Sequence, residues 1–180
     1  MTLVEINKKL VRNVFLNTEL LLNEGEKEIF EYDIQAFMFL FLKRYLKGSS
    51  YTAGREKVSK VDCVIFDNTT KPLKPVCFYE IKTYFKSHEN IQVAHFDNDL
   101  DKLASLIQEH NDTKGLFITA GLTEKYKSTS VSALPFIKAH LDTDRKWQSR
   151  KLPSGITVDL RPSVKETRGL CSVMTWEVKL

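Results

Sequence analysis

Apolar residues recur every three or four positions over the first part of the chain, which is the spacing of one face of an α-helix. A first helix or helix pair is predicted over residues 3–22, and its apolar face consists of Leu3, Ile6, Leu10 and Val14. Residues 23–25 break this pattern. A second helix is predicted over residues 26–46, ending before Gly48. Its inward stripe consists of Ile34, Met38, Phe41 and Tyr45.

Carboxylates lie in line with the apolar stripe of the second helix. Continuing the stripe backwards by one turn reaches Glu31, and a second turn reaches Glu28. Burying a charge is costly unless another group pairs with it. A carboxylate aligned with a core stripe is therefore a candidate functional residue.

The middle of the chain is predicted to form strands that are covered on both faces. Residues 61–66 and 76–82 are apolar on both faces, and residues 67–72 carry turn signals, so the two segments are expected to form a hairpin. A helix follows, with Phe96, Leu100, Leu103 and Ile107 on one face. Residues 115–121 are predicted to form a strand parallel to residues 76–82, reached by a right-handed crossover.

The remainder of the chain predicts a helix over residues 131–141 and two strands over residues 156–160 and 172–178. This order of elements predicts an α/β protein with one mixed central β-sheet and helices on both of its faces. A length of 180 residues suits a single domain, which would span residues 1–180.

Composition and charge are those of a soluble globular protein, with 42% hydrophobic and 28% charged residues. The net charge of +4 tolerates a polyanionic partner without requiring one. Three widely spaced cysteines, with no disulfide or metal-binding pattern, favour a reducing cytoplasm. The longest apolar run, residues 36–42, is too short to span a bilayer, so no membrane association is expected.

Two carboxylates and one lysine lie within the predicted strands. Strand periodicity places Glu80 and Lys82 on one face, about 7 Å apart, and a hairpin of suitable register would bring Asp62 to Glu80. Two adjacent carboxylates repel each other, and a divalent cation such as Mg²⁺ would relieve that repulsion. Lys82 could hold the attacking water or offset charge on a phosphate, and Glu31 could supply a further carboxylate.

This order of residues resembles the PD-(D/E)XK nuclease superfamily, whose fold occurs in many restriction and repair endonucleases. A helix carries Glu31 and Gln35, a strand beginning at Val61 carries Asp62, and the next strand ends in Glu80-Ile81-Lys82. The resemblance covers about residues 26–121, with the N-terminal helix and the C-terminal strands as elaborations.

The chain departs from the family pattern in two places. Val61 stands where the eponymous proline would be. The helical glutamate is ambiguous between Glu28 and Glu31, and Glu31 is favoured because Gln35 follows it by one helical turn. Glu56, six residues before Asp62, is a third candidate for the accessory carboxylate.

The resemblance implies a restriction-endonuclease-like fold and hydrolysis of phosphodiester bonds in DNA with Mg²⁺ or Mn²⁺. Asp62 and Glu80 would be metal ligands, Lys82 would assist the water, and Glu31 would be an accessory group. A single site cuts one strand, so a homodimer or a partner specificity subunit is expected. The alternative is a non-catalytic binding or assembly subunit that keeps the fold and uses Glu80 and Lys82 structurally. RNA stays open as a substrate.

Three further residues are predicted to contact nucleic acid: Gln92, which follows the Glu-x-Lys strand, and Lys146 and Arg150. The last two lie in residues 145–151, where basic residues accompany an aromatic one, a combination compatible with gripping a DNA backbone. Such a segment alone is more often an exposed loop, and Glu-x-Lys on one strand face is commonly an exposed ion pair. The order of all the elements together is what favours a nuclease.

Overall fold

The computed structural model describes residues 1–26, 28–54, 61–85, 93–124 and 147–180. Within these ranges the chain forms three helices, α1 (Leu3–Asn23), α2 (Glu31–Tyr45) and α3 (Val93–Glu109). The described strands are β1 (Tyr51–Gly54), β2 (Cys63–Asp67), β3 (Lys74–Tyr84), β4 (Lys114–Leu122), β5 (Gln148–Lys151), β6 (Thr157–Arg168) and β7 (Cys171–Lys179). None of the helices in these ranges is long and apolar enough to cross a membrane.

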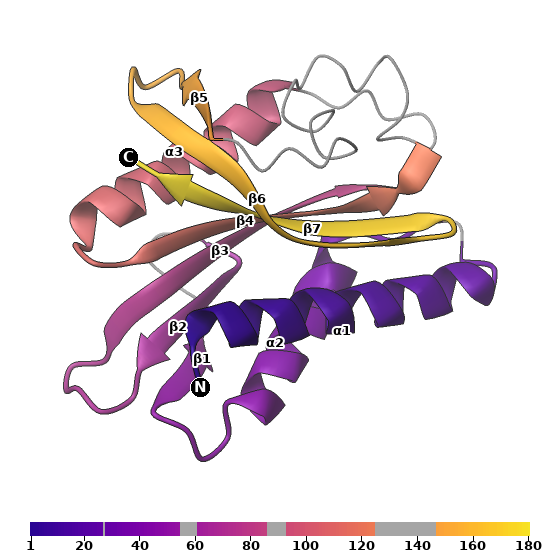
Figure 1. Ribbon diagram of the computed structural model, residues 1–180, viewed down its shortest axis with the longest axis horizontal. Helices are drawn as coiled ribbons and strands as arrows, with labels where there is room; N and C mark the ends of the chain where they lie inside the picture. Colours follow the sequence, from indigo (N-terminus) through magenta and orange to yellow (C-terminus); the bar gives the residue numbers. More distant parts are fainter. Residues whose placement is uncertain (27, 55–60, 86–92, 125–146) are drawn as a thin grey trace.

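The seven described strands form one open mixed sheet in the order β1-β2-β3-β4-β7-β6-β5 (Figure 1). Strands β2 and β3 form the predicted antiparallel hairpin. Strand β4 runs parallel to β3 and is reached through α3, as the sequence predicts. All other neighbouring pairs are antiparallel. The predicted α/β class with a mixed central sheet is therefore confirmed.

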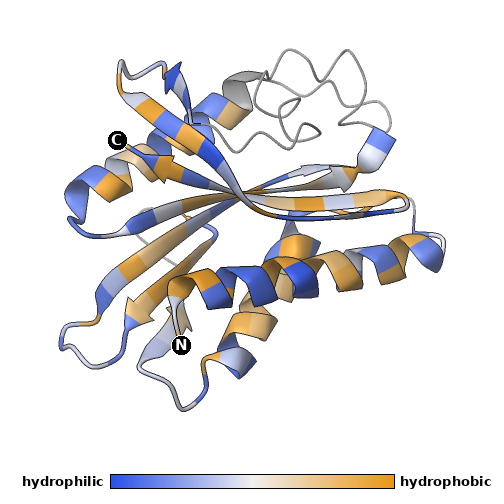
Figure 2. Cartoon of the chain, in the orientation of Figure 1, coloured by the Kyte–Doolittle hydropathy of each residue, from blue (hydrophilic) through white to orange (hydrophobic). Residues whose placement is uncertain are grey.

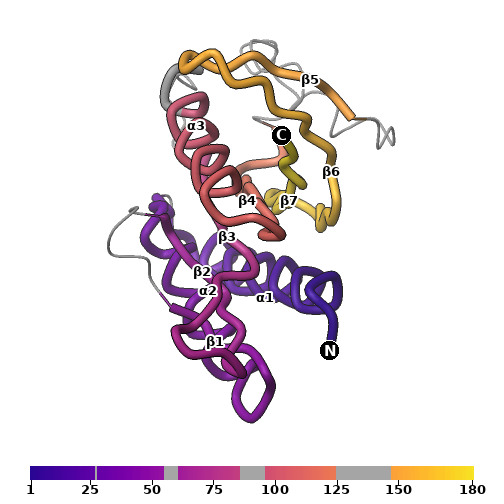
Figure 3. Tube along the Cα trace, turned by 90° about the vertical axis from the view of Figure 1, so that its left-hand side faces the viewer, coloured from indigo at the N-terminus to yellow at the C-terminus, as the bar shows by residue number. Residues whose placement is uncertain are grey.

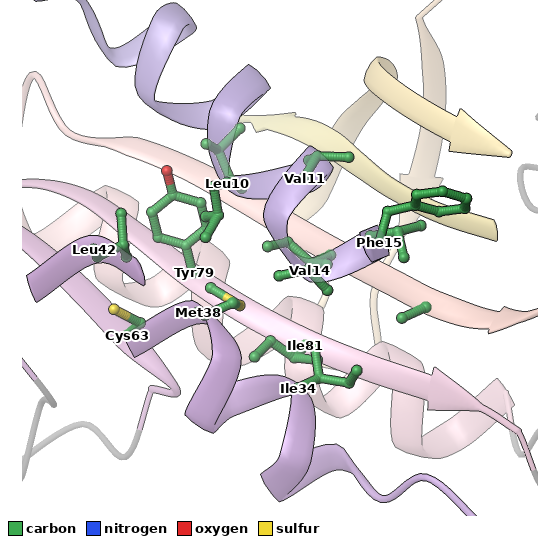
Figure 4. Close-up of a cluster of buried hydrophobic side chains, with 14 of the residues drawn as sticks. Leu10, Val11, Val14, Phe15, Ile34, Met38, Leu42, Cys63, Tyr79 and Ile81 are labelled. Carbon is green, nitrogen blue, oxygen red and sulfur yellow. The ribbon is translucent and has the colours of Figure 1, made fainter. Parts of the chain in front are cut away.

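The helices cover both faces of the sheet, as expected. Helices α1 and α2 pack on one face, and α3 packs on the other (Figures 1 and 3). Figure 4 shows the first layer, in which Met38 and Leu42 of α2 pack near Tyr79 of β3. The second layer joins α3 to the sheet through Phe96, Phe117 and Trp176. Figure 2 shows apolar residues along the central strands. Along α1, apolar and polar residues alternate.

Helix α2 begins at Glu31, which corrects the predicted start at residue 26. The Asp33 carboxylate accepts a hydrogen bond of 2.9 Å from the Phe30 backbone N–H and thereby satisfies a donor at the helix start. Residue Ile29 is buried in the core ahead of the helix. Glu28 therefore precedes α2 and is exposed, so it does not continue the helical stripe.

The buried face of α2 also differs from the prediction. Its fully buried residues are Ile34, Met38 and Leu42, at a spacing of four. Phe41 and Tyr45, which were predicted to face inward, are only partly buried and stack on each other with ring centroids 5.1 Å apart. The sheet contacts the row of residues four apart, so the aromatic pair is turned toward the side of the helix.

The strands at the two edges of the sheet were not predicted. Strand β1 is four residues long, and β5, with the sequence Gln-Ser-Arg-Lys, has no apolar residue. Short polar strands lack the periodic pattern that sequence analysis requires. Strand β6 extends to Arg168, well beyond the predicted residue 160, through a largely polar stretch. The helix predicted over residues 131–141 lies outside the described residues.

Candidate active site

Asp62 lies just before β2 and opposite Glu80 of β3. The register pairs Cys63 with Tyr79, so the preceding and following residues come side by side. Two hydrogen bonds of 2.7 Å fix the Asp62 carboxylate: Gln35 Nε2 donates to its Oδ1, and the Ile81 backbone N–H donates to its Oδ2. Asp62 is therefore held by the second helix and by the neighbouring strand at the same time.

Glu80 is a buried carboxylate, with 1% of its surface exposed. Its neighbours in sequence, Tyr79 and Ile81, pack toward α1 and α2, so strand alternation turns Glu80 toward α3. There it meets Lys102, whose Nζ lies 2.8 Å from Glu80 Oε1. The buried carboxylate thus has a cationic partner on the opposite helical layer.

Lys82, two residues further along β3, lies between both helical layers. Its Nζ is 2.7 Å from Asp99 Oδ2 on α3 and 3.7 Å from Glu31 Oε2 on α2. The Lys82 side chain is 22% exposed, so it remains accessible to a ligand or water. Two acidic residues from opposite sides of the sheet therefore hold one ammonium group.

The pKa values of the three carboxyl groups of the site are raised. Burial raises the pKa of Glu80 to about 9, and the nearby charge of Asp62 adds to this effect while Lys102 opposes it. Burial also raises the pKa of Asp62, against the hydrogen bond from Ile81 N–H. It likewise raises the pKa of Glu31, against the charge of Lys82. Carboxylates whose charged form is disfavoured in this way are typical of functional sites.

The pKa of Lys82 is shifted in the direction that keeps its ammonium group charged. Burial acts to lower the pKa of Lys82, but the hydrogen bond to Asp99 and the charges of Glu31 and Asp99 raise it above its ordinary value. Lys82 is therefore a cation at neutral pH. It can donate hydrogen bonds and offset negative charge, but it does not act as a base there.

The structure brings together the four residues that the sequence nominated as catalytic: Glu31, Asp62, Glu80 and Lys82. Of the candidates for the accessory carboxylate, Glu31 contacts Lys82, Glu28 is exposed ahead of α2, and Glu56 lies outside the described residues.

The residues predicted to contact nucleic acid are placed only in part. Gln92 and Lys146 lie outside the described residues. Arg150 of β5 forms a two-point ion pair with Asp97 of α3, with Nε–Oδ1 and Nη2–Oδ2 distances of 2.6 and 2.8 Å. The Arg150 guanidinium therefore ties an edge strand to α3, and its predicted contact with nucleic acid stays a prediction.

Sequence reasoning missed two residues of the site, Asp99 and Lys102. Both lie on α3 and flank the apolar residues Leu100 and Leu103 that anchor this helix. The only signal in the sequence was their position beside the apolar stripe, three residues apart, which also describes many solvent-exposed ion pairs. Their pairing with Lys82 and Glu80 depends on how α3 packs against β3, which no local sequence pattern specifies.

The donor set at this site suits a hard divalent cation. Asp62 and Glu80 offer carboxylate oxygens from two paired strands, and Mg²⁺ commonly binds through one or two carboxylates with waters or phosphate oxygens completing its shell. Within the described parts of the chain, no group of three or more His, Cys, Asp or Glu side chains is placed to hold a metal ion. A metal here would therefore take two side-chain ligands from these residues.

Comparisons with protein-family models, with curated proteins and with solved structures found no match to the chain.

Proposed function

We propose that the chain is a divalent-metal-dependent endonuclease that hydrolyses phosphodiester bonds in DNA, with a restriction-endonuclease-like core. The observation that carries the proposal is the convergence of Asp62, Glu80 and Lys82 at one end of a β-hairpin, where Glu80 is buried, Asp62 is partly buried and the pKa of each carboxyl is raised. Helix α2, strands β2 and β3, helix α3 and strand β4 follow one another in the order by which the sequence resembles the PD-(D/E)XK superfamily, with the short strand β1 between α2 and β2.

In this proposal Asp62 and Glu80 hold Mg²⁺ or Mn²⁺, which supplies a water of lowered pKa and neutralises charge on the scissile phosphate. Gln35 and the Ile81 N–H keep the Asp62 carboxylate in one orientation. The charged Lys82 orients the attacking water and offsets the charge that develops on the phosphate oxygens. Asp99 and Glu31 restrict where the Lys82 ammonium lies.

A single site of this kind cleaves one strand. Cleavage of both strands would require two copies of the chain or a partner subunit that supplies specificity. A homodimer or such a complex is therefore part of the proposal, with DNA as the substrate.

A second candidate function is that of a non-catalytic subunit that binds nucleic acid or assembles with another protein. The ion pairs favour it: Lys82 pairs with Asp99, and Glu80 pairs with Lys102, so these two residues of the motif already have partners of opposite charge within the chain. In this role the four groups would stabilise the contact between β3 and α3, and no metal ion would bind.

Cleavage of supercoiled plasmid in Mg²⁺ or Mn²⁺ tests the proposal. Wild type is compared with Asp62→Ala and Lys82→Ala, and with Asp67→Ala and Lys74→Ala as controls from the far ends of the same two strands. We expect metal-dependent cleavage that is lost in the first pair of variants and kept in the second. A folded wild type that cleaves neither DNA nor RNA would favour the non-catalytic role. Cleavage that survives both site substitutions would mean that other residues catalyse it.

A further inference from the structure

Helix α3 places a positive charge against the carboxylate pair. Lys102 Nζ lies 2.8 Å from Glu80 Oε1, and the Lys102 side chain is 30% exposed while the Glu80 side chain is 2% exposed. The lysine therefore reaches from a solvent-accessible helix surface onto a buried acid. Such a flexible side chain can withdraw into solvent, whereas Glu80 cannot leave its strand.

The Lys102 charge acts on both carboxylates. It lowers the pKa of Asp62 as well as that of Glu80, which means that it favours the ionised form of each. That is the electrostatic effect a bound cation has on its ligands. A single ammonium group beside Glu80 thus supplies part of the positive charge that a divalent cation would bring.

Burial makes this counter-charge important. Glu80 is 1% exposed and has a second acid beside it, so two negative charges at this pair are strongly disfavoured and a nearby cation has a large effect on it. An ammonium and a metal ion both placed against Glu80 would repel each other. Occupation of the pair by Lys102 and by a metal ion should therefore be mutually exclusive.

We propose that Lys102 is an internal cation that neutralises the Asp62–Glu80 pair in the absence of metal and must leave Glu80 when a divalent metal ion binds. The proposal rests on the proposed function in one respect, that this pair is the metal site. It adds that α3 sets the affinity for the metal, because each binding event breaks the ion pair between Lys102 and Glu80.

Replacing Lys102 should have two opposite effects. Without the competing ammonium, Lys102→Met should bind Mn²⁺ more tightly, by roughly 5- to 150-fold. The same change leaves the buried Glu80 and the partly buried Asp62 without this cation, so the metal-free variant should unfold at a lower temperature than wild type. Saturating Mn²⁺ should restore the melting temperature, since the metal takes over the role of the lost charge.

The experiment is a calorimetric titration with Mn²⁺, paired with thermal unfolding in EDTA and in excess Mn²⁺. The variants are Lys102→Met, Lys102→Arg, which keeps the charge and should bind Mn²⁺ as wild type does, and Lys9→Met, a control at an exposed lysine of α1. Lys102→Gln repeats the test if the methionine variant does not fold. The expected result is tighter Mn²⁺ binding in Lys102→Met or Lys102→Gln, with wild-type affinity in Lys102→Arg and Lys9→Met.

Mn²⁺ affinity that is unchanged or weaker in the folded uncharged variants would overturn the inference, and so would a wild type that binds no Mn²⁺. Failure of the proposed function looks different. If Mn²⁺ binds, and binds more tightly without Lys102, while no plasmid or RNA is cleaved, then the competition stands and the nuclease assignment falls.

Discussion

The ammonium group of Lys82 on β3 lies 2.7 Å from the carboxylate of Asp99 on α3, and on its other side the Glu31 carboxylate of α2 is 3.7 Å away. Helices on opposite faces of the sheet thus converge on one lysine. Because the shorter contact is with Asp99, this residue has the larger part in fixing the position of the Lys82 ammonium. We interpret Asp99 as a positioning residue that acts through Lys82.

Asp99→Asn should slow plasmid cleavage by roughly 10-fold. This loss is smaller than the contribution of a group that itself donates or accepts the proton, because Asp99 acts through Lys82. Asparagine keeps the shape of the side chain but removes the charge that raises the pKa of Lys82. The loss of activity at alkaline pH should therefore begin at a lower pH than in wild type. The measurement is the rate of cleavage against pH, together with Mn²⁺ affinity, which should change little.

Asp101→Asn is the matched control on the same helix. Asp101 bonds Ser154 and contacts none of the four nominated residues among the described contacts. The Asp101→Asn substitution should leave both the rate of cleavage and its pH profile unchanged. Equal effects of the two substitutions would show that Asp99 matters only through the general charge or stability of α3.

Gln35→Ala should weaken Mn²⁺ binding by roughly 10- to 100-fold, as is typical when a group that orients a metal ligand is removed. Gln35 Nε2 donates the 2.7 Å hydrogen bond that fixes Asp62 Oδ1. Without this hydrogen bond, the side of the Asp62 carboxylate that faces α2 is no longer held, and the carboxylate can rotate out of the orientation that suits a shared metal ion. Calorimetric titration with Mn²⁺ measures the effect.

Gln108→Ala, at an exposed position of α3, provides the comparison for this substitution. Its Mn²⁺ affinity should equal that of wild type. If Gln35→Ala also binds Mn²⁺ normally, the hydrogen bond to Asp62 does not prepare the site.

Sequence reasoning succeeded at this site where the relevant spacing is local. Two apolar segments joined by a short turn make a hairpin, and the hairpin register alone brings Asp62 to Glu80. The period of a strand places Lys82 on the same face as Glu80. These relationships depend on few residues and on regular geometry, so they could be predicted.

The missed residues depend on tertiary placement. Asp99 and Lys102 meet β3 only because the crossover lays α3 over that strand, and no periodicity specifies which polar residue of a helix faces a buried acid. The start of α2 was misplaced for a related reason. Ile29 is as apolar as a helix core residue, but it packs ahead of a helix whose first turn is capped by Asp33.

Leu42→Ala and Leu40→Ala test the observed orientation of α2. Leu42 is fully buried against the sheet, and Leu40, two residues earlier, is 57% exposed. Truncating Leu42 should lower the free energy of unfolding by roughly 2–5 kcal/mol, because it removes buried methyl groups and leaves a cavity. Truncating Leu40 should change it by about 0.5 kcal/mol or less. Urea denaturation of both variants in EDTA gives the comparison, and similar losses would mean that α2 is rotated from the orientation described.

The stability of the metal-free protein should depend on pH through Glu80. Burial raises the pKa of Glu80 to about 9 in the folded state, from an ordinary value of 4.5. Between these values the folded protein keeps a proton that the unfolded chain releases. The free energy of unfolding should therefore fall as pH rises through this window, by at most about 1.4 kcal/mol per pH unit from this group.

Glu80→Gln should remove that contribution, because glutamine resembles the protonated acid and does not ionise. In EDTA the variant should be more stable than wild type at about pH 8, and the advantage should shrink towards about pH 5, where Glu80 is protonated in the folded wild type. Urea denaturation across this range measures it, with Glu109→Gln at an exposed position of α3 as the control. A constant difference at every pH would mean that Glu80 is already ionised throughout, and that Lys102 compensates its burial completely.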